Sequence, residues 1–245
     1  MNTQFQIIFP CSETDVNEIH PRYQSDAKVM SDMGITVGTI PLAESTELMY
    51  RGFIVNVKDK FPNDARYLNT YEIYTRYQYL SDYYPCISDL SIETFFVDDL
   101  NESVYKLIEE KRWDKVFIKK DSKALEHIEE GKSVWPQTSF DEMLTLYNEY
   151  PFEGKFAIRK FIDKETIDKE ERYWVFNGNI YHRHKDIPEV VKKAAKRLNT
   201  LGSRYYTIDA TPEFVVEVNP GESSDRHAVN SAELFASWIK KEFDN

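Results

Sequence analysis

A series of short apolar strands in the second half of the chain most constrains its fold. After Pro151 the sequence turns into runs of apolar and aromatic residues separated by turn residues, which is typical of β-strands. Asn177-Gly178 stands between two of these runs and favours a two-residue hairpin turn. An amphipathic helix over about 187–199 interrupts the series. The predicted strands are 156–163, 171–178, 179–184, 205–210 and 214–219.

The first 95 or so residues show a different pattern, in which strands alternate with helices. This alternation predicts an α/β unit. A strand of the same apolar kind is expected at 113–121, and further helices are expected at 98–112, after the capping box that begins at Ser139, and at 228–242. The elements predicted before residue 95 are strands 5–9, 35–40 and 50–57, helix 21–33 and a tyrosine-rich, mostly helical stretch over 68–84.

Composition excludes several classes of protein. The net charge of −11 argues against nucleic-acid binding as the main function. No apolar run is long enough to span a membrane and no secretory signal is visible, so we expect a cytoplasmic protein. The 8 glycines form neither a dinucleotide-binding fingerprint nor a Walker A loop. A nucleotide site in this chain would therefore have to work without those glycine loops.

The strand at 214–219 carries a candidate magnesium site. Side chains alternate along a strand, so Glu217 and Asn219 point to the same face. Asp209 ends the preceding strand and could add a third oxygen ligand. Mg²⁺ prefers a few hard oxygen ligands together with phosphate oxygens. The alternative is a strand whose polar face simply meets solvent.

Several cations lie within otherwise apolar or aromatic strands. Strand interiors rarely hold a charge without a partner, and a bound polyphosphate would supply one. Arginine suits phosphate because its planar group donates two parallel hydrogen bonds. The alternative is internal pairing, for example of Arg172 with Glu170 or Asp168. The cations concerned are Lys119, Lys120, Arg159, Arg172 and Arg183.

Taken in order, these motifs resemble the ATP-grasp fold, and within it the clade named for its two arginines and lysine, which includes a eukaryotic assembly protein for a translation initiation factor. VFIKKD resembles the lysine strand of that family, and FAIRKFID resembles the strand that leads into its adenine-binding hinge. The run from Glu170 to Gly178 is similar to the Glu-x-Arg strand and hairpin of the clade. EVNPG is similar to the closing metal motif, with Asp209 upstream.

The resemblance implies an α/β (α+β) fold of the ATP-grasp type. An N-terminal α/β domain would cover residues 1–97, and the ATP-grasp domain would cover 98–245. Two α+β subdomains, 98–153 and 154–245, would then enclose the nucleotide between them. The segment 121–137, which contains Gly131, would serve as the phosphate flap.

The resemblance also implies a role for each candidate residue. Lys119 would contact the ATP phosphates, with Lys120 as the alternative, because only one of two neighbouring strand residues faces the nucleotide. Arg172 and Arg183 would face the γ-phosphate, and Arg159 could join them. Further cofactor contacts would come from Glu170 and from backbone groups near Lys160, Phe161 and Ile162, while Asp209, Glu217 and Asn219 would hold Mg²⁺.

The activity implied by the resemblance is an ATP- and Mg²⁺-dependent ligase. Such an enzyme phosphorylates a carboxylate and joins it to an amine, releasing ADP and phosphate. The acceptor, which could be a peptide or protein, would lie between the N-terminal domain and the nucleotide, near Arg51. The alternative is an assembly factor that uses ATP and Mg²⁺ to hold a protein partner without ligation. Neither hypothesis involves a membrane.

Overall fold

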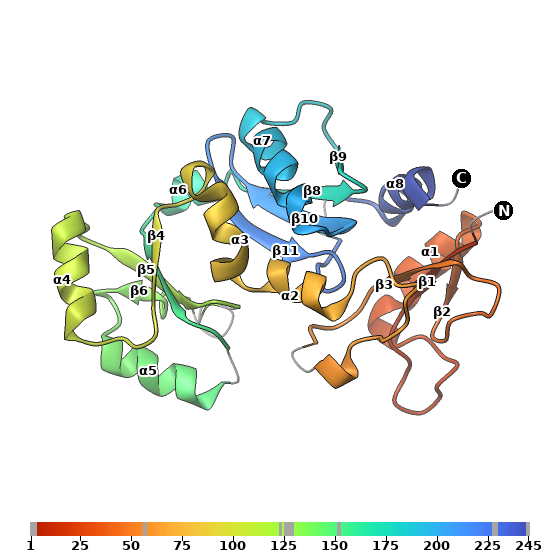
Figure 1. Cartoon of the computed structure of the whole chain (residues 1–245), viewed down its shortest axis with the longest axis horizontal. Coiled ribbons are helices and arrows are strands. Elements are labelled where there is room, and N and C mark those ends of the chain that lie inside the picture. Colours follow the sequence, from red (N-terminus) through yellow and green to blue (C-terminus); the bar gives the residue numbers. More distant parts are fainter. Residues whose placement is uncertain are drawn as a thin grey trace.

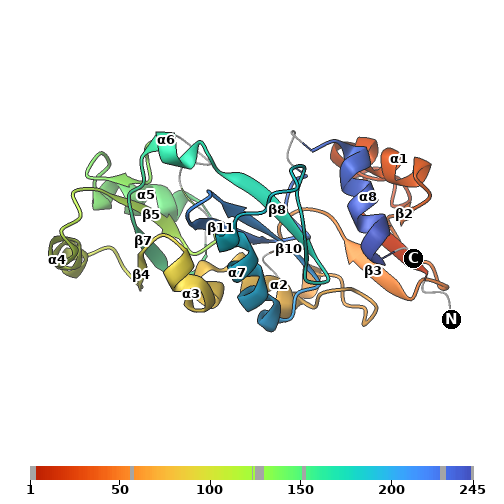
Figure 2. The ribbon, with the colours of Figure 1, turned by 90° about the horizontal axis from the view of Figure 1, so that it is seen from above.

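The computed structural model describes residues 4–55, 58–122, 124, 130–150, 153–226 and 230–243. Its strands form three sheets that follow one another along the long axis of the molecule (Figure 1). An N-terminal sheet lies at one end, a second sheet lies in the middle, and a third lies at the other end (Figure 2). The predicted mixed α/β fold is confirmed.

The N-terminal sheet is parallel, with β1 (Phe5–Ile8) between β2 (Thr36–Gly38) and β3 (Glu47–Tyr50). Every residue of β1 is buried, as expected for the central strand of a covered parallel sheet. Helix α1 (Gln24–Asp32) packs against α8 (Ala232–Phe243), the last helix of the chain (Figure 1). The two ends of the sequence therefore share one hydrophobic core.

The predicted strand at 50–57 is wrong in its position, because β3 ends at Tyr50. The backbone N–H of Gly52 leaves the sheet and donates to the carbonyl of Glu222, 2.7 Å away. The ring of Phe53 then packs edge-on against His20 and Tyr23 instead of entering the sheet. Residues 56 and 57 lie outside the described part of the chain.

The middle sheet is antiparallel, in the order β11 (Val215–Pro220), β10 (Tyr205–Ala210), β8 (Glu171–Phe176) and β9 (Asn179–Tyr181). The predicted hairpin is confirmed at Asn177 and Gly178, whose φ angles of 46° and 83° match a turn that needs two left-handed residues. The strand predicted at 179–184 stops at Tyr181. Beyond it the backbone N–H of His184 donates to Nδ1 of His182, which closes a local turn.

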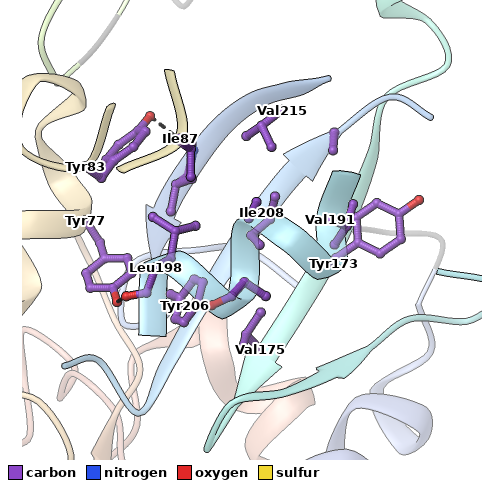
Figure 3. Packing of buried hydrophobic residues seen from close by; sticks show 14 of the residues in the cluster. Tyr77, Tyr83, Ile87, Tyr173, Val175, Val191, Leu198, Tyr206, Ile208 and Val215 are labelled. Carbon is purple, nitrogen blue, oxygen red and sulfur yellow. Dashed lines mark hydrogen bonds between the residues drawn. The ribbon is translucent and has the colours of Figure 1, made fainter. Parts of the chain in front are cut away.

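One face of the middle sheet is covered by α7 (Glu189–Leu198) together with the tyrosine-rich helices α2 (Tyr71–Gln78) and α3 (Leu80–Ile87) (Figure 3). The rings of Tyr77 and Tyr83 are buried there. The hydroxyl of Tyr77 donates to the carbonyl of Leu198, and the hydroxyl of Tyr83 accepts from the backbone N–H of Val218. Tyrosine suits this position because its apolar body is buried while its hydroxyl finds a backbone partner.

The third sheet has the order β4 (Thr94–Val97), β7 (Phe156–Lys160), β5 (Val116–Lys120) and β6 (Val134–Trp135), all antiparallel. Strand β4 was not among the predicted strands. It forms one edge of the sheet, and none of its residues is fully buried. The division of the chain at residue 97 stays a prediction. Helices α4 (Glu102–Lys111), α5 (Phe140–Glu149) and α6 (Lys164–Ile167) and the 3₁₀ turns Pro21–Tyr23, Lys58–Lys60, Ser88–Leu90 and Asn199–Leu201 complete the described elements.

Candidate functional site

The three predicted metal ligands and Arg172 lie on one face of the middle sheet. Strand register places Asp209 opposite both Arg172 on β8 and Glu217 on β11. Asn219 lies two residues beyond Glu217 and so shares its face. Helices α2, α3 and α7 pack on the opposite face, against residues such as Tyr173 and Val218. The predicted grouping of these side chains therefore follows from strand alternation together with the observed register.

Lys119 of β5 joins these side chains in one continuous charged network. The network consists of Lys119, Glu217, Asn219, Asp209 and Arg172. Arg172 donates from Nε and Nη2 to the two carboxylate oxygens of Asp209, both at 2.7 Å. The amide of Asn219 donates to Asp209 and to Glu217, each at 3.2 Å. Lys119, a residue that is only 4% exposed, donates from its ammonium to the other carboxylate oxygen of Glu217. Each carboxylate in the network therefore already faces a cation.

A cavity of about 960 Å³ opens beside this network. It lies between the third sheet and strand β11, since its wall includes residues of β5, β7 and β11. Its lining includes the apolar side chains of Phe117, Phe161 and Ile162 and charged side chains, among them Lys119 and Glu217 of the network. A ligand with an apolar part and a strongly charged part fits such a lining.

The two neighbouring lysines of β5 point in opposite directions. Lys119 lines the cavity. Lys120 instead donates to the carbonyl of Gly154 at 3.1 Å, with its Nζ 3.7 Å from the ring centre of Phe156. Burial lowers the pKa of Lys120. Of the two candidates, Lys119 is the one that the structure places with the charged network.

Arg159 and Arg183 have different surroundings. Arg159 is buried, lines the cavity and donates to the carbonyl of Val216 at 2.8 Å, and burial lowers its pKa. Arg183 donates to Glu171 at 2.6 Å, on the side of the sheet where His182 packs against Tyr173. The structure brings Arg159 to the site but does not bring Arg183 there.

Glu170 and the hinge segment also reach the cavity. Lys160 ends β7, Phe161 and Ile162 follow it directly, and all three line one wall. Burial, followed by the nearby carboxylates of Asp209 and Glu217, raises the pKa of Glu170 to about 7. The predicted alternative partners of Arg172 were Glu170 and Asp168, but the guanidinium pairs with Asp209 instead.

The predicted metal ligands suit Mg²⁺ only together with phosphate. Within the described ranges, no three His, Cys, Asp or Glu side chains are grouped so as to hold a metal ion. Two carboxylates and an amide on one sheet face remain, and Mg²⁺ is commonly bound by one or two carboxylates with water and substrate phosphates completing its shell. The donor set therefore fits a metal ion that binds with a nucleotide.

The predicted phosphate flap can be located only in part. Gly131 lines the cavity and has a φ of 85°, a conformation that favours glycine. Residues 123 and 125–129 of this segment lie outside the described part of the chain.

Sequence reasoning missed two buried carboxylates near the site. Asp121, directly after β5, accepts from the backbone N–H and hydroxyl of Ser81 and so caps the start of α3. Glu222, shortly after β11, accepts from the amide of Asn69 at 2.8 Å. The residues adjacent to these two carboxylates do not indicate either contact, because the partners Ser81 and Asn69 are distant in sequence.

Glu222 is expected to make the stability of the fold depend on pH. Burial raises its pKa from 4.5 to about 7, and its Oε2 has no hydrogen-bond partner in the described structure. The stability that the protonated group contributes is complete below about pH 4.5 and is lost as the pH rises to about 7. We expect Glu222→Gln to raise the urea midpoint at pH 8 relative to the wild type and to change it little at pH 4.5. Equal midpoint shifts at both pH values would contradict this cause.

Comparison with known proteins identifies the family. The model that matches describes an ATP-grasp domain, family 3 of the clade named for two arginines and a lysine, and it covers residues 63–238, which is most of the chain. The chain belongs to this family. The predicted ATP-grasp fold and family are thereby confirmed. Ligases are among the proteins whose solved structures share this fold. Comparison with curated protein sequences finds no match.

Solved structures share the fold at low sequence identity. The D-cycloserine synthetase DcsG has a TM-score of 0.62 and 13% identity, covering 98% of this chain and 99% of that one. A Chryseobacterium gregarium RiPP-associated ATP-grasp ligase, in complex with ADP and a leader and core peptide, has a TM-score of 0.61 and 13% identity, covering 100% and 97%. The macrocyclase MdnC from Microcystis aeruginosa MRC, bound with its precursor peptide MdnA, has a TM-score of 0.59 and 14% identity, covering 97% and 99%.

The helices of this ATP-grasp chain are short. Among the described residues, no helix combines the length and the apolar character needed to cross a membrane. The longest of them, α8, has 12 residues and carries Lys240 and Lys241 in its last turn.

Proposed function

We propose that this ATP-grasp protein is an ATP- and Mg²⁺-dependent carboxylate–amine ligase that acts through an acyl-phosphate and releases ADP and phosphate. The observation that carries the proposal is the charged network beside the cavity, to whose lining Lys119 and Glu217 belong. The network supports the proposal because it joins one cation, Lys119, to two carboxylates, Glu217 directly and Asp209 through Asn219, and these groups suit a polyphosphate and its metal ion.

The cavity supports a specific arrangement of the nucleotide. The adenine would lie against the apolar side chains of Phe161 and Ile162, and backbone groups of residues 160–162 would form hydrogen bonds with its edge. Lys119, Arg159 and Arg172 would face the phosphates, and Asp209, Glu217 and Asn219 would hold Mg²⁺. Mg²⁺ would neutralise charge on the phosphate oxygens. Glu170 would complete the nucleotide contacts. Arg183 would act there only if its bond to Glu171 were broken.

The chemistry of phosphoryl transfer matches this set of groups. The transferred phosphoryl group carries spread negative charge, so catalysis depends mainly on positioning and on cations aimed at its oxygens. The guanidinium of Arg172 is held rigidly by two hydrogen bonds to Asp209, which reduces the reorganisation needed when charge develops. A carboxylate substrate supplies the nucleophile for the first step, and an amine supplies it for the second. No nucleophilic side chain of the protein is required.

A peptide is the proposed acceptor. Two of the structural neighbours are described as bound with a precursor peptide or with a leader and core peptide. In this chain the sheet face that carries Arg172 continues through Trp174 toward the N-terminal sheet, where Trp174 contacts Phe235 of α8. Trp174 and Phe235 are fully buried, so an acceptor between the N-terminal sheet and the nucleotide would have to lie outside this core, on the side of Arg172.

ADP release tests this proposal. Purified protein with Mg·ATP should release ADP only when peptides that offer a carboxylate and an amine are both present, and Glu217→Gln should abolish the release. Glu213→Gln, an exposed neighbour near the start of the same strand, is the matched control and should behave as the wild type. Tight Mg·ATP binding without turnover, together with a stable complex with a protein partner, would instead favour the assembly factor.

A further inference from the structure

Arg51 is a buried cation that the proposed chemistry does not use. It follows β3 directly and is only 4% exposed. Burial lowers its pKa, and in the described structure no carboxylate accepts a hydrogen bond from it. Burying a charge without an ion-pair partner costs free energy. The guanidinium of Arg51 must therefore be stabilised by the other contacts that it makes.

The hydrogen bonds of Arg51 converge on the segment that follows the metal-site strand. Its Nη1 donates to the carbonyls of Gly221 and Ser224, both at 2.8 Å. The guanidinium carbon lies 5.0 Å from the ring centre of Trp174 and 4.9 Å from that of Phe235. These two rings and two carbonyls fix the guanidinium in place.

The same segment is also held by Arg172. Nη1 of Arg172 donates to the carbonyl of Asp225 at 3.1 Å, while its other nitrogens donate to Asp209. Ser224 ties the segment to the sheet, because its hydroxyl donates to the carbonyl of Pro220 and lies 3.1 Å from the hydroxyl of Thr207. Arg51 and Arg172 thus bind the carbonyls of two consecutive residues.

We propose that Arg51 is a positioning residue that holds segment 221–225, and through it Arg172 and Asp209, in the arrangement required by Mg·ATP. This inference rests on the proposed function. It also gives the N-terminal sheet a direct connection to the metal end of the site, because Gly52 of the same loop donates to the carbonyl of Glu222. The cavity wall at residues 160–162 makes none of these contacts.

The test separates metal-dependent binding from metal-free binding. Calorimetry should show that Arg51→Met weakens Mg·ATP binding about tenfold, the size expected when coupling between distant groups is lost. The affinity for metal-free ADP should stay within about twofold of that of the wild type, because this binding relies on Lys119 and on the cavity wall at residues 160–162. The expected tenfold change in Mg·ATP affinity corresponds to ~1.4 kcal/mol. Arg51→Lys keeps a cation that can donate to the carbonyls and should restore much of the Mg·ATP affinity.

A matched control comes from another arginine that contacts the same segment. Arg22→Met removes an exposed arginine that contacts only the side chain of Asp225 in this segment, and it should leave both affinities unchanged. If Arg51→Met does not fold, Ser224→Ala breaks the same segment more mildly and should show the same selective loss. An equal loss of ADP and Mg·ATP affinity, or no loss of either, would overturn the role of Arg51. Failure of the wild type to bind Mg·ATP would overturn the proposed function itself.

Discussion

Replacing Lys119 with methionine is expected to weaken ATP binding and, at the same time, to strengthen the binding of a divalent cation alone. The ammonium of Lys119 donates to Glu217, so the free protein already neutralises a predicted metal ligand with its own lysine. Removing the lysine deletes a phosphate contact worth about 1.5–3 kcal/mol, which corresponds to roughly tenfold to hundredfold in affinity. It also takes this cation away from Glu217, so a metal ion gains a ligand. Calorimetric titrations with ATP and with Mn²⁺ alone measure the two effects separately.

Lys120→Met is the matched control for this experiment. Lys120 has the same charge and the neighbouring position, but it contacts Gly154 and Phe156 away from the network. Its replacement should change neither titration appreciably. If Lys119→Met left Mn²⁺ binding unchanged while ATP binding fell, the pairing of Lys119 with Glu217 would not control access of the metal ion.

Replacing Arg172 with alanine is expected to destabilise the fold as well as to abolish binding of Mg·ATP. The pair with Asp209 is largely buried, with side-chain exposures of 17% and 5%. Breaking a buried pair by removing one partner costs about 3–5 kcal/mol, because the other charge is left uncompensated. Urea unfolding of Arg172→Ala should show a loss of this size.

The double variant Arg172→Ala with Asp209→Ala distinguishes stability from function. It removes both charges, so most of the lost stability should return, whereas binding of Mg·ATP should stay absent. Arg183→Ala breaks the more exposed pair with Glu171 and should cost at most about 1 kcal/mol. A single Arg172→Ala variant as stable as the wild type would show that Asp209 is not buried as a charge.

Strand alternation predicted the core of the site, because it needs only local sequence. Glu217 and Asn219 share a face for this reason, and Lys119 and Lys120 point apart for the same reason. The pairing of strands was not predictable in this way. That Asp209 stands opposite Arg172, rather than Glu170 or Asp168 pairing with it, follows from the register of β8 and β10.

The remaining differences come from contacts between distant segments. The apolar run at 50–57 predicted a strand, but Gly52 and Arg51 bond to the segment after β11, 170 residues away in the case of Arg51 and Gly221, and the chain leaves the sheet. Arg183 was predicted as a phosphate ligand because it lies within the predicted strand 179–184, yet β9 ends at Tyr181 and the arginine donates to Glu171. Neither set of partners can be identified from the neighbouring sequence.

The central claim is that the charged network and the cavity form one Mg·ATP site, and calorimetric titration of the purified chain with ATP, with and without Mg²⁺, tests it most directly. We expect saturable binding that Mg²⁺ strengthens, because the metal ion neutralises the phosphates and brings Asp209 and Glu217 into the complex. Absence of binding at millimolar ATP in the presence of Mg²⁺ would contradict the claim and would leave Lys119–Glu217 and Arg172–Asp209 as ion pairs that serve the fold alone.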